Sequence, residues 1–119
     1  MTYYPWYTLA RPPVDEYKTT QVYHAIYGNH LSTLRTLLGD PTVDVNWRIP
    51  GGRFNGYTYL QMAIAMERVE CVEILLAHKD IRVMQQQHDH LTLLMLLHRS
   101  DSDRAEKIRR MIHDYLSRA

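Results

Sequence analysis

The sequence predicts an all-α protein, a helical-repeat solenoid built from about three helix-turn-helix units. Two observations predict this fold. The chain of 119 residues matches itself when shifted, because Ala25-Ile26 and Leu37-Leu38 recur as Ala63-Ile64 and Leu75-Leu76, 38 residues later. The matched segments also carry apolar residues at the spacing of one helix face. No unit is large enough to bury its apolar face alone, so the units must stack to form a continuous core.

Composition limits the class of protein. The length fits one domain, and a hydrophobic fraction of 45% is typical of a globular chain. A net charge of +1 argues against a dedicated nucleic-acid binder, which is usually strongly basic. The single cysteine, Cys71, favours a reducing compartment, so we expect a cytoplasmic protein. No run approaches the roughly 20 apolar residues that span a bilayer, so no membrane partner is expected.

An aromatic N-terminal arm is expected over residues 1–19, before the repeat domain at 20–119. Two roles remain open for the arm: it covers the apolar end of the array, or it contacts a partner. Its aromatic residues are Tyr3, Tyr4, Trp6, Tyr7 and Tyr17.

The first unit is expected over about residues 20–53 and the second over 54–87. In the first, a helical stripe formed by Leu34, Leu37 and Leu38 is stopped by Gly39. In the second, Thr58 is positioned to cap a helix whose apolar face contains Leu60, Ala63 and Ile64, and a second helix follows with Cys71, Val72, Leu75 and Leu76.

The third unit, over about 88–119, matches less well. Thr92 repeats Thr58 at an offset of 34, which places Leu97 where the second unit has the small residue Ala63, so we expect altered helix packing there. Asp103 and Glu106 have the spacing of a capping box, and Glu106 also has a favourable partner at Arg110.

The second unit resembles an ankyrin repeat. That family's signature, Gly-x-Thr-Pro-Leu-His-x-Ala, is matched by Gly56, Thr58, Leu60 and Ala63, while Tyr59 replaces Pro and Gln61 replaces His.

The first unit shows the same resemblance in its turn, where Asn29-His30 stands for the family's Gly-His, and Asn tolerates the left-handed backbone conformation that Gly adopts. The resemblance covers about residues 20–116. It implies a non-catalytic adaptor or inhibitor that binds another protein, without a cofactor.

One departure from the family is a longer connection between the first two units. Their spacing exceeds the usual ~33 residues by about five, and the excess lies between Trp47 and Gly56. The segment resembles a lengthened ankyrin finger, with Pro50-Gly51-Gly52 as its turn. Two roles remain open for Trp47 and Phe54, namely contact with a partner or packing on the neighbouring units.

In the family, the concave face made of finger tips and first helices binds the partner. Carrying these positions over predicts an apolar patch with an arginine rim. The predicted partner-binding residues are Trp47, Arg48, Arg53, Phe54, Tyr57, Met66, Leu91 and Arg99.

Other function classes are also considered. Arg48 and Arg53 could contact nucleic acid, and His88, His90 and His98 could hold a metal ion, although neither spacing matches a standard motif. No catalytic residue is predicted. The chain also resembles short ankyrin proteins that intracellular bacteria or viruses deliver into host cells, which leaves a pathogen effector or a complex subunit as alternatives.

Overall fold

Helices account for almost all regular structure in the computed structural model, which describes residues 13–118 of the chain. The helices form three pairs with short turns between partners. The first pair is α2 (Glu16–Tyr27) and α3 (Leu31–Leu38), the second is α4 (Tyr59–Ala65) and α5 (Val69–Leu76), and the third is α6 (Asp89–Leu97) and α7 (Asp103–Arg118).

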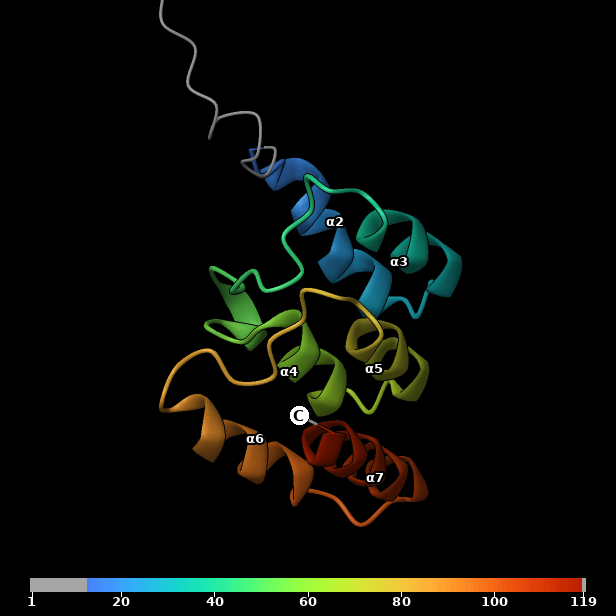
Figure 1. Cartoon of the computed structure of the whole chain (residues 1–119), viewed down its shortest axis with the longest axis vertical. Helices are drawn as coiled ribbons and strands as arrows, with labels where there is room; N and C mark the ends of the chain where they lie inside the picture. Colours follow the sequence, from blue (N-terminus) through green and yellow to red (C-terminus); the bar gives the residue numbers. More distant parts are fainter. Residues whose placement is uncertain (1–12, 119) are drawn as a thin grey trace, which may run out of the picture.

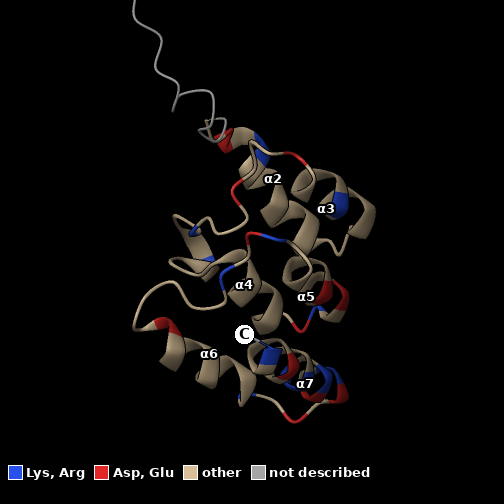
Figure 2. Cartoon of the chain, viewed as in Figure 1, with Lys and Arg blue, Asp and Glu red and all other residues tan. Residues whose placement is uncertain are grey.

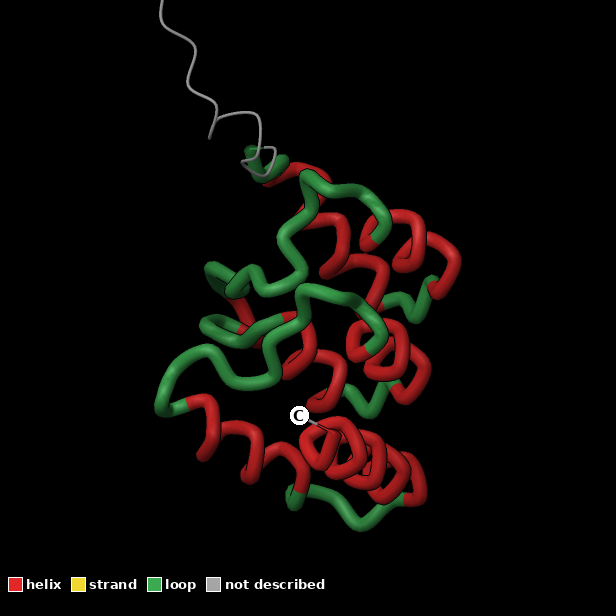
Figure 3. The backbone as a smooth tube through the Cα atoms, in the orientation of Figure 1, coloured by secondary structure: helices red, strands yellow, loops and turns green. Residues whose placement is uncertain are grey.

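The pairs stack into a solenoid of two helix layers. Helix α4 packs between α2 and α6, and α5 packs between α3 and α7 (Figure 1). The long loops run from the second helix of one pair to the first helix of the next (Figure 3). This arrangement confirms the predicted all-α repeat fold. Helix α2 begins within the segment predicted as the arm, while residues 1–12 lie outside the described residues.

The helix starts follow from capping chemistry. Thr58 and Gln61 form a reciprocal capping box at α4, as the N-cap prediction for Thr58 requires. The capping box predicted for α7, with Asp103 as its first residue, is wrong. The residue before it, Ser102, caps the helix, because its hydroxyl accepts from the Ala105 amide at 3.1 Å. Glu106 instead forms ion pairs with Arg109 at 2.8 Å and, as predicted, with Arg110 at 3.5 Å.

A left-handed residue ends the first helix of each of the first two pairs. Asn29 has a φ of 57°, which confirms the prediction that it replaces the family's Gly. Glu67 takes the same conformation in the second pair, with a φ of 56°. The next amide in each case, that of His30 or Arg68, donates back to the helix and closes the turn.

Two long side chains connect the first and second pairs. The buried Tyr59 donates from its hydroxyl to the Thr19 carbonyl at 2.8 Å. Arg68 donates to the Tyr27 carbonyl at the end of α2 at 2.7 Å. Both bonds satisfy groups at the interface between repeats, so stacking is specified by polar contacts as well as by apolar burial.

The offset between the second and third pairs is one residue shorter than the 34 residues that the sequence match predicts. Leu93, Leu96 and Leu97 are buried with the same spacing as Leu60, Ala63 and Ile64. Thr92 lies inside α6 and donates to the His88 carbonyl, so it does not cap the helix. The residue at the small-residue position is therefore Leu96 rather than Leu97. Helix α6 packs less closely on α7 than α4 does on α5.

The predicted finger is a short hairpin. The Ile49 amide donates to the Tyr57 carbonyl and the Gly56 amide donates to the Ile49 carbonyl, each at 2.8 Å. Arg48 and Thr58 pair at its base, and the 3-10 turn η1 (Gly52–Phe54) forms its tip.

Two finger glycines make a matched test of the hairpin. Gly56 has a φ of +81°, whereas Gly51 has an extended φ of −178°, and a β-carbon at either would meet no atom within 4 Å. We expect Gly56→Ala to lower the free energy of unfolding by about 1–2 kcal/mol, because Ala disfavours the left-handed region. Gly51→Ala should leave it within about 0.5 kcal/mol. Urea titration measures both, and equal effects would contradict the hairpin geometry.

Candidate partner-binding site

Four aromatic rings form a continuous row from α2 to the finger. Tyr27 stacks on Tyr23 at a centroid distance of 6.2 Å, Tyr23 meets Phe54 edge-on at 6.2 Å, and Phe54 lies 6.1 Å from Tyr57. The guanidinium of Arg53 lies 5.1 Å from the Phe54 ring centroid. We call Tyr23, Tyr27, Phe54 and Tyr57 the aromatic row. It joins the first repeat to the finger that precedes the second.

Exposure differs along the aromatic row. Tyr27 is 53% exposed, Tyr23 and Tyr57 are half-buried, and Phe54 is only 3% exposed. Phe54 therefore supports the row from below, while the tyrosine rings and the exposed Arg53 remain accessible. The combination of aromatic rings with arginine is typical of residues that dominate protein interfaces.

Trp47 also packs against the core. Its side chain is half-buried, and its buried indole N–H has no hydrogen-bond acceptor within residues 13–118. The sequence leaves two roles open for Trp47 and Phe54, namely partner contact or packing. In the free protein both side chains pack on their neighbours.

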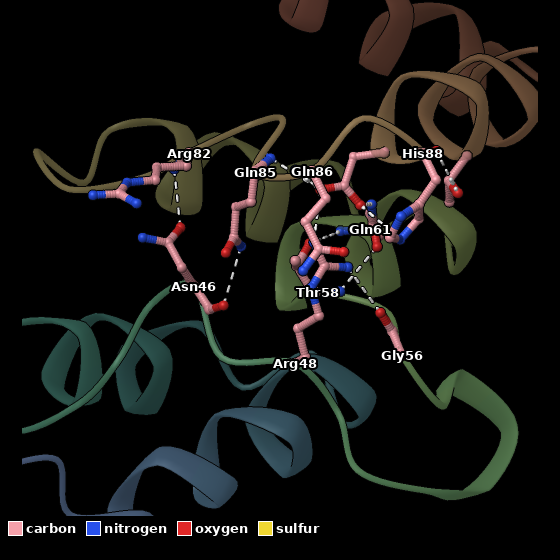
Figure 4. A network of polar contacts seen from close by, with 11 residues as sticks. Asn46, Arg48, Gly56, Thr58, Gln61, Arg82, Gln85, Gln86 and His88 are labelled. Carbon is pink, nitrogen blue, oxygen red and sulfur yellow. Dashed lines mark hydrogen bonds and ion pairs between the residues drawn. The ribbon is translucent and has the colours of Figure 1, made fainter.

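Arg48 points into the molecule rather than toward the aromatic row. Its Nη2 donates to Asp89 Oδ2 at 2.6 Å and its Nη1 donates to the Gly56 carbonyl at 3.0 Å (Figure 4). The Asp89 carboxylate is 1% exposed, so this ion pair links the base of the finger to the start of α6. Arg48 is therefore a positioning residue for the finger.

Asp89 collects donors from three segments of the chain. Besides Arg48, the Gln61 side chain donates to it at 3.2 Å, and the amides of Gln85 and Gln86 donate at 2.9 and 2.8 Å (Figure 4). Burial raises the pKa of this carboxyl, but the hydrogen bonds from Arg48, the two amides and Gln61 outweigh burial and hold the pKa well below its usual range. Asp89 is therefore a carboxylate at neutral pH.

Asn46 extends this network toward the next loop. Its side-chain amide donates to the Asp80 carbonyl at 2.8 Å and accepts from the Arg82 amide at 2.9 Å, and its backbone carbonyl accepts from the Gln85 side chain (Figure 4). The two loops that connect the helix pairs are thereby joined to each other.

The other three predicted contact residues lie elsewhere on the first-helix layer. Met66 is half-buried at the end of α4, Leu91 is 64% exposed on α6, and Arg99 is exposed just after α6. Among residues 13–118, no hydrogen bond, ion pair or ring contact joins any of them to the aromatic row. The structure thus brings together only Arg53, Phe54 and Tyr57 from the predicted set.

The predicted contact set contains neither Tyr23 nor Tyr27. A signal for both was available, because Tyr23 and Tyr27 are four residues apart and so share one face of a helix.

The alternative chemistries receive no geometric support. Within the described part of the chain, no three His, Cys, Asp or Glu side chains converge as metal ligands. His88 lies 3.6 Å from the Asp89 carboxylate instead.

Burial raises the pKa of Cys71 to about 11, so its thiol stays protonated at neutral pH and is a poor nucleophile. None of the described helices combines the length and the hydropathy needed to cross a bilayer.

Comparison with known proteins identifies one family. The model described as ankyrin repeats (3 copies) matches residues 8–87, which is more than half of the chain. No curated protein and no solved structure matches the chain.

The Asp89 network makes a quantitative prediction about stability. We expect Asp89→Asn to lower the free energy of unfolding by about 3 kcal/mol at pH 7, because Arg48 would lose its buried counter-charge. The folded-state pKa is below that of the unfolded chain, so the carboxylate's contribution is present above about pH 4 and declines as the pH falls further. Urea titrations from pH 7 to pH 3 should show the two proteins converging in acid.

Asp101→Asn is the control for this comparison. Asp101 is exposed in the turn before α7, so its substitution should change stability by less than about 0.5 kcal/mol. A stability difference between wild type and Asp89→Asn that stays constant down to pH 3 would contradict the assigned role of the carboxylate.

Proposed function

The chain belongs to the ankyrin-repeat family, and we propose that it is a non-catalytic module that binds a partner protein through its concave face and its lengthened finger. Ankyrin repeats generally mediate protein–protein interaction. The observation that carries the proposal is the aromatic row, which offers the exposed ring of Tyr27 and the half-buried rings of Tyr23 and Tyr57, with the Arg53 guanidinium over Phe54. Aromatic and arginine side chains supply large contact area and strong polar contacts at interface centres.

Preorganisation supports this function. The rings are held by mutual contact and by the core beneath Phe54, and the finger that carries Arg53 is anchored through Arg48 to Asp89. Side chains that are already ordered lose little conformational entropy when a partner docks. The binding surface therefore needs no rearrangement of the finger.

The nucleic-acid alternative has weaker support. Arg48 is neutralised by Asp89, which leaves Arg53 as the exposed cation of the finger. A single free cation gives little counterion release on phosphate binding. A cytoplasmic setting, and a role as an effector or as a subunit of a larger complex, are consistent with the proposed function and remain proposals.

The proposal is tested with exposed residues, because replacing Phe54 would remove a core side chain. We expect the double substitution Tyr27→Ala and Arg53→Ala to weaken partner affinity by at least about tenfold, since hot-spot truncations cost 2 kcal/mol or more. The partner is first captured from the native cell with the wild-type chain. Its affinity is then measured by titration with purified proteins.

Arg35→Ala is the control. Arg35 is exposed on α3, in the other helix layer from the aromatic row. Its substitution should leave affinity unchanged. The proposal fails if the double variant binds as tightly as wild type while its unfolding transition is unaltered. A partner that proves to be a nucleic acid would favour the alternative.

A further inference from the structure

The chain contains one Asn-Gly pair, Asn55-Gly56, which lies in the finger just after the 3-10 turn. Both residues are exposed to solvent. Asparagine side chains are chemically labile, and a following glycine has no side chain to keep its amide nitrogen away from the asparagine. The other two asparagines, Asn29 and Asn46, precede a histidine and a tryptophan. Asn55 is therefore the asparagine whose sequence most favours deamidation.

Deamidation at this pair needs only water as a co-reactant. The Gly56 nitrogen loses its proton to solvent and attacks Cγ of Asn55, which forms a new C–N bond and a five-membered succinimide ring. The bond from Cγ to the side-chain nitrogen breaks, and that nitrogen takes a proton from solvent and leaves as ammonia. Water then opens the ring at either carbonyl. Opening at Cγ gives aspartate, whereas opening at the main-chain carbonyl gives isoaspartate, whose main chain runs through Cβ and Cγ.

The closed hairpin prevents this attack. The Gly56 amide donates to the Ile49 carbonyl at 2.8 Å, so its nitrogen faces across the hairpin. The Asn55 amide is also bonded, to the Gly52 carbonyl at 3.2 Å. Ring closure requires Cβ of Asn55 and the Gly56 nitrogen to eclipse each other about the Cα–C bond, whereas a ψ of 129° rotates them well apart. The reaction must therefore start from an open finger.

Opening of the finger tip does not require the repeats to unfold. Gly51, Gly52 and Arg53 are exposed, as is Gly56 itself, and Phe54 is the buried residue that attaches this tip to the core. Exposed segments held by few backbone hydrogen bonds open at a lower free energy than the whole fold. Local opening of the finger thus controls access to the reaction.

The products change the charge and the length of the finger. Residues 47–58 contain two arginines and no acidic residue, as the colouring of this segment shows (Figure 2). Because Arg48 is paired with Asp89, the exposed Arg53 gives the tip its net positive charge. A carboxylate at position 55 offsets that charge from two residues away. Isoaspartate also adds one methylene to the main chain, which displaces the Gly56 amide from the Ile49 carbonyl.

We propose that Asn55-Gly56 is a deamidation site that the closed finger protects and that local opening of the finger exposes. The modification needs no partner, so it stands apart from the proposed function. Its products alter the surface proposed for partner binding, and that consequence alone rests on the proposed function.

Incubation of the purified full chain in mildly alkaline buffer, folded or in urea, tests the protection. Peptide mapping by mass spectrometry follows each asparagine, and fragmentation distinguishes aspartate from isoaspartate. We expect Asn55 to convert at least about tenfold faster in urea than in the folded chain, because the open finger is a minor population of the native state. In urea it should convert faster than Asn29 and Asn46. Equal rates for Asn55 in both conditions, or no conversion in urea, would overturn the proposal.

Two proline substitutions distinguish finger opening from unfolding of the whole chain. Pro50 and Pro41 are both exposed loop prolines, but only Pro50 lies in the finger. Pro50→Gly removes a constraint on the open finger and should speed conversion of Asn55 in the folded chain by about two- to fivefold. Pro41→Gly is the matched control and should leave the rate unchanged. Equal acceleration by both variants would show that the reaction requires global unfolding, which contradicts control by the finger.

Hydrogen exchange tests the consequence for the hairpin. The isoaspartate form, separated from the unmodified chain by ion exchange, should lose protection at the Gly56 amide while the amides of α4 keep theirs. Asn55→Gln is the control, since it removes the Asn-Gly pair and should show no conversion at this position. Unchanged protection of Gly56 in the isoaspartate form would contradict the predicted loss of its hydrogen bond. These measurements use the chain alone, so failure of the concave-face proposal would not affect them.

Discussion

The buried carboxylate of Asp89 is the contact on which the geometry of the finger depends. It receives the guanidinium of Arg48 from the finger base, the side chain of Gln61 from α4, and two amides from the loop before α6. An uncompensated charge at 1% exposure would be costly, so all these donors must be in place together. The network therefore fixes the finger, the second pair and the third pair relative to one another.

This constraint distinguishes the residues that support the binding surface from the residues that are free to contact a partner. Arg48 and Phe54 belong to the support, since one neutralises Asp89 and the other packs beneath the tyrosines. Arg53 and Tyr27 remain free to meet a partner. The two arginines of the finger thus have different roles, because Arg48 at its base is neutralised by Asp89 whereas Arg53 in the 3-10 turn at its tip is exposed.

Much of the fold could be predicted from the sequence because it is encoded locally. The stripes of leucine and isoleucine define the helices, Thr58 marks a helix start, and Asn29 marks a left-handed turn. The third pair was predicted one residue out of register, because the match of Thr92 to Thr58 was followed rather than the spacing of the buried leucines. Where the signature motif is poorly matched, the spacing of apolar residues predicts the helix register better than a capping residue does. Packing in the core constrains that spacing.

The candidate site could be predicted only in part, because its organisation depends on contacts between distant segments. The sequence places Arg48 and Asp89 41 residues apart, and nothing local indicates that they meet. The same holds for Tyr23 and Phe54, which come together only when the finger folds back on α2. Conversely, Tyr59 and Gln61, which replace two residues of the family's signature, connect the second pair to its neighbours.

These two replacements hold the second pair between its neighbours. Tyr59 replaces proline and bonds back to the first pair, and Gln61 replaces histidine and bonds forward to the third. Both interior faces of the second pair are therefore held by specific polar contacts. The third pair, in which Leu96 stands at the position of Ala63, has an apolar groove between α6 and α7 that is lined by Leu93, Leu97 and Ile112.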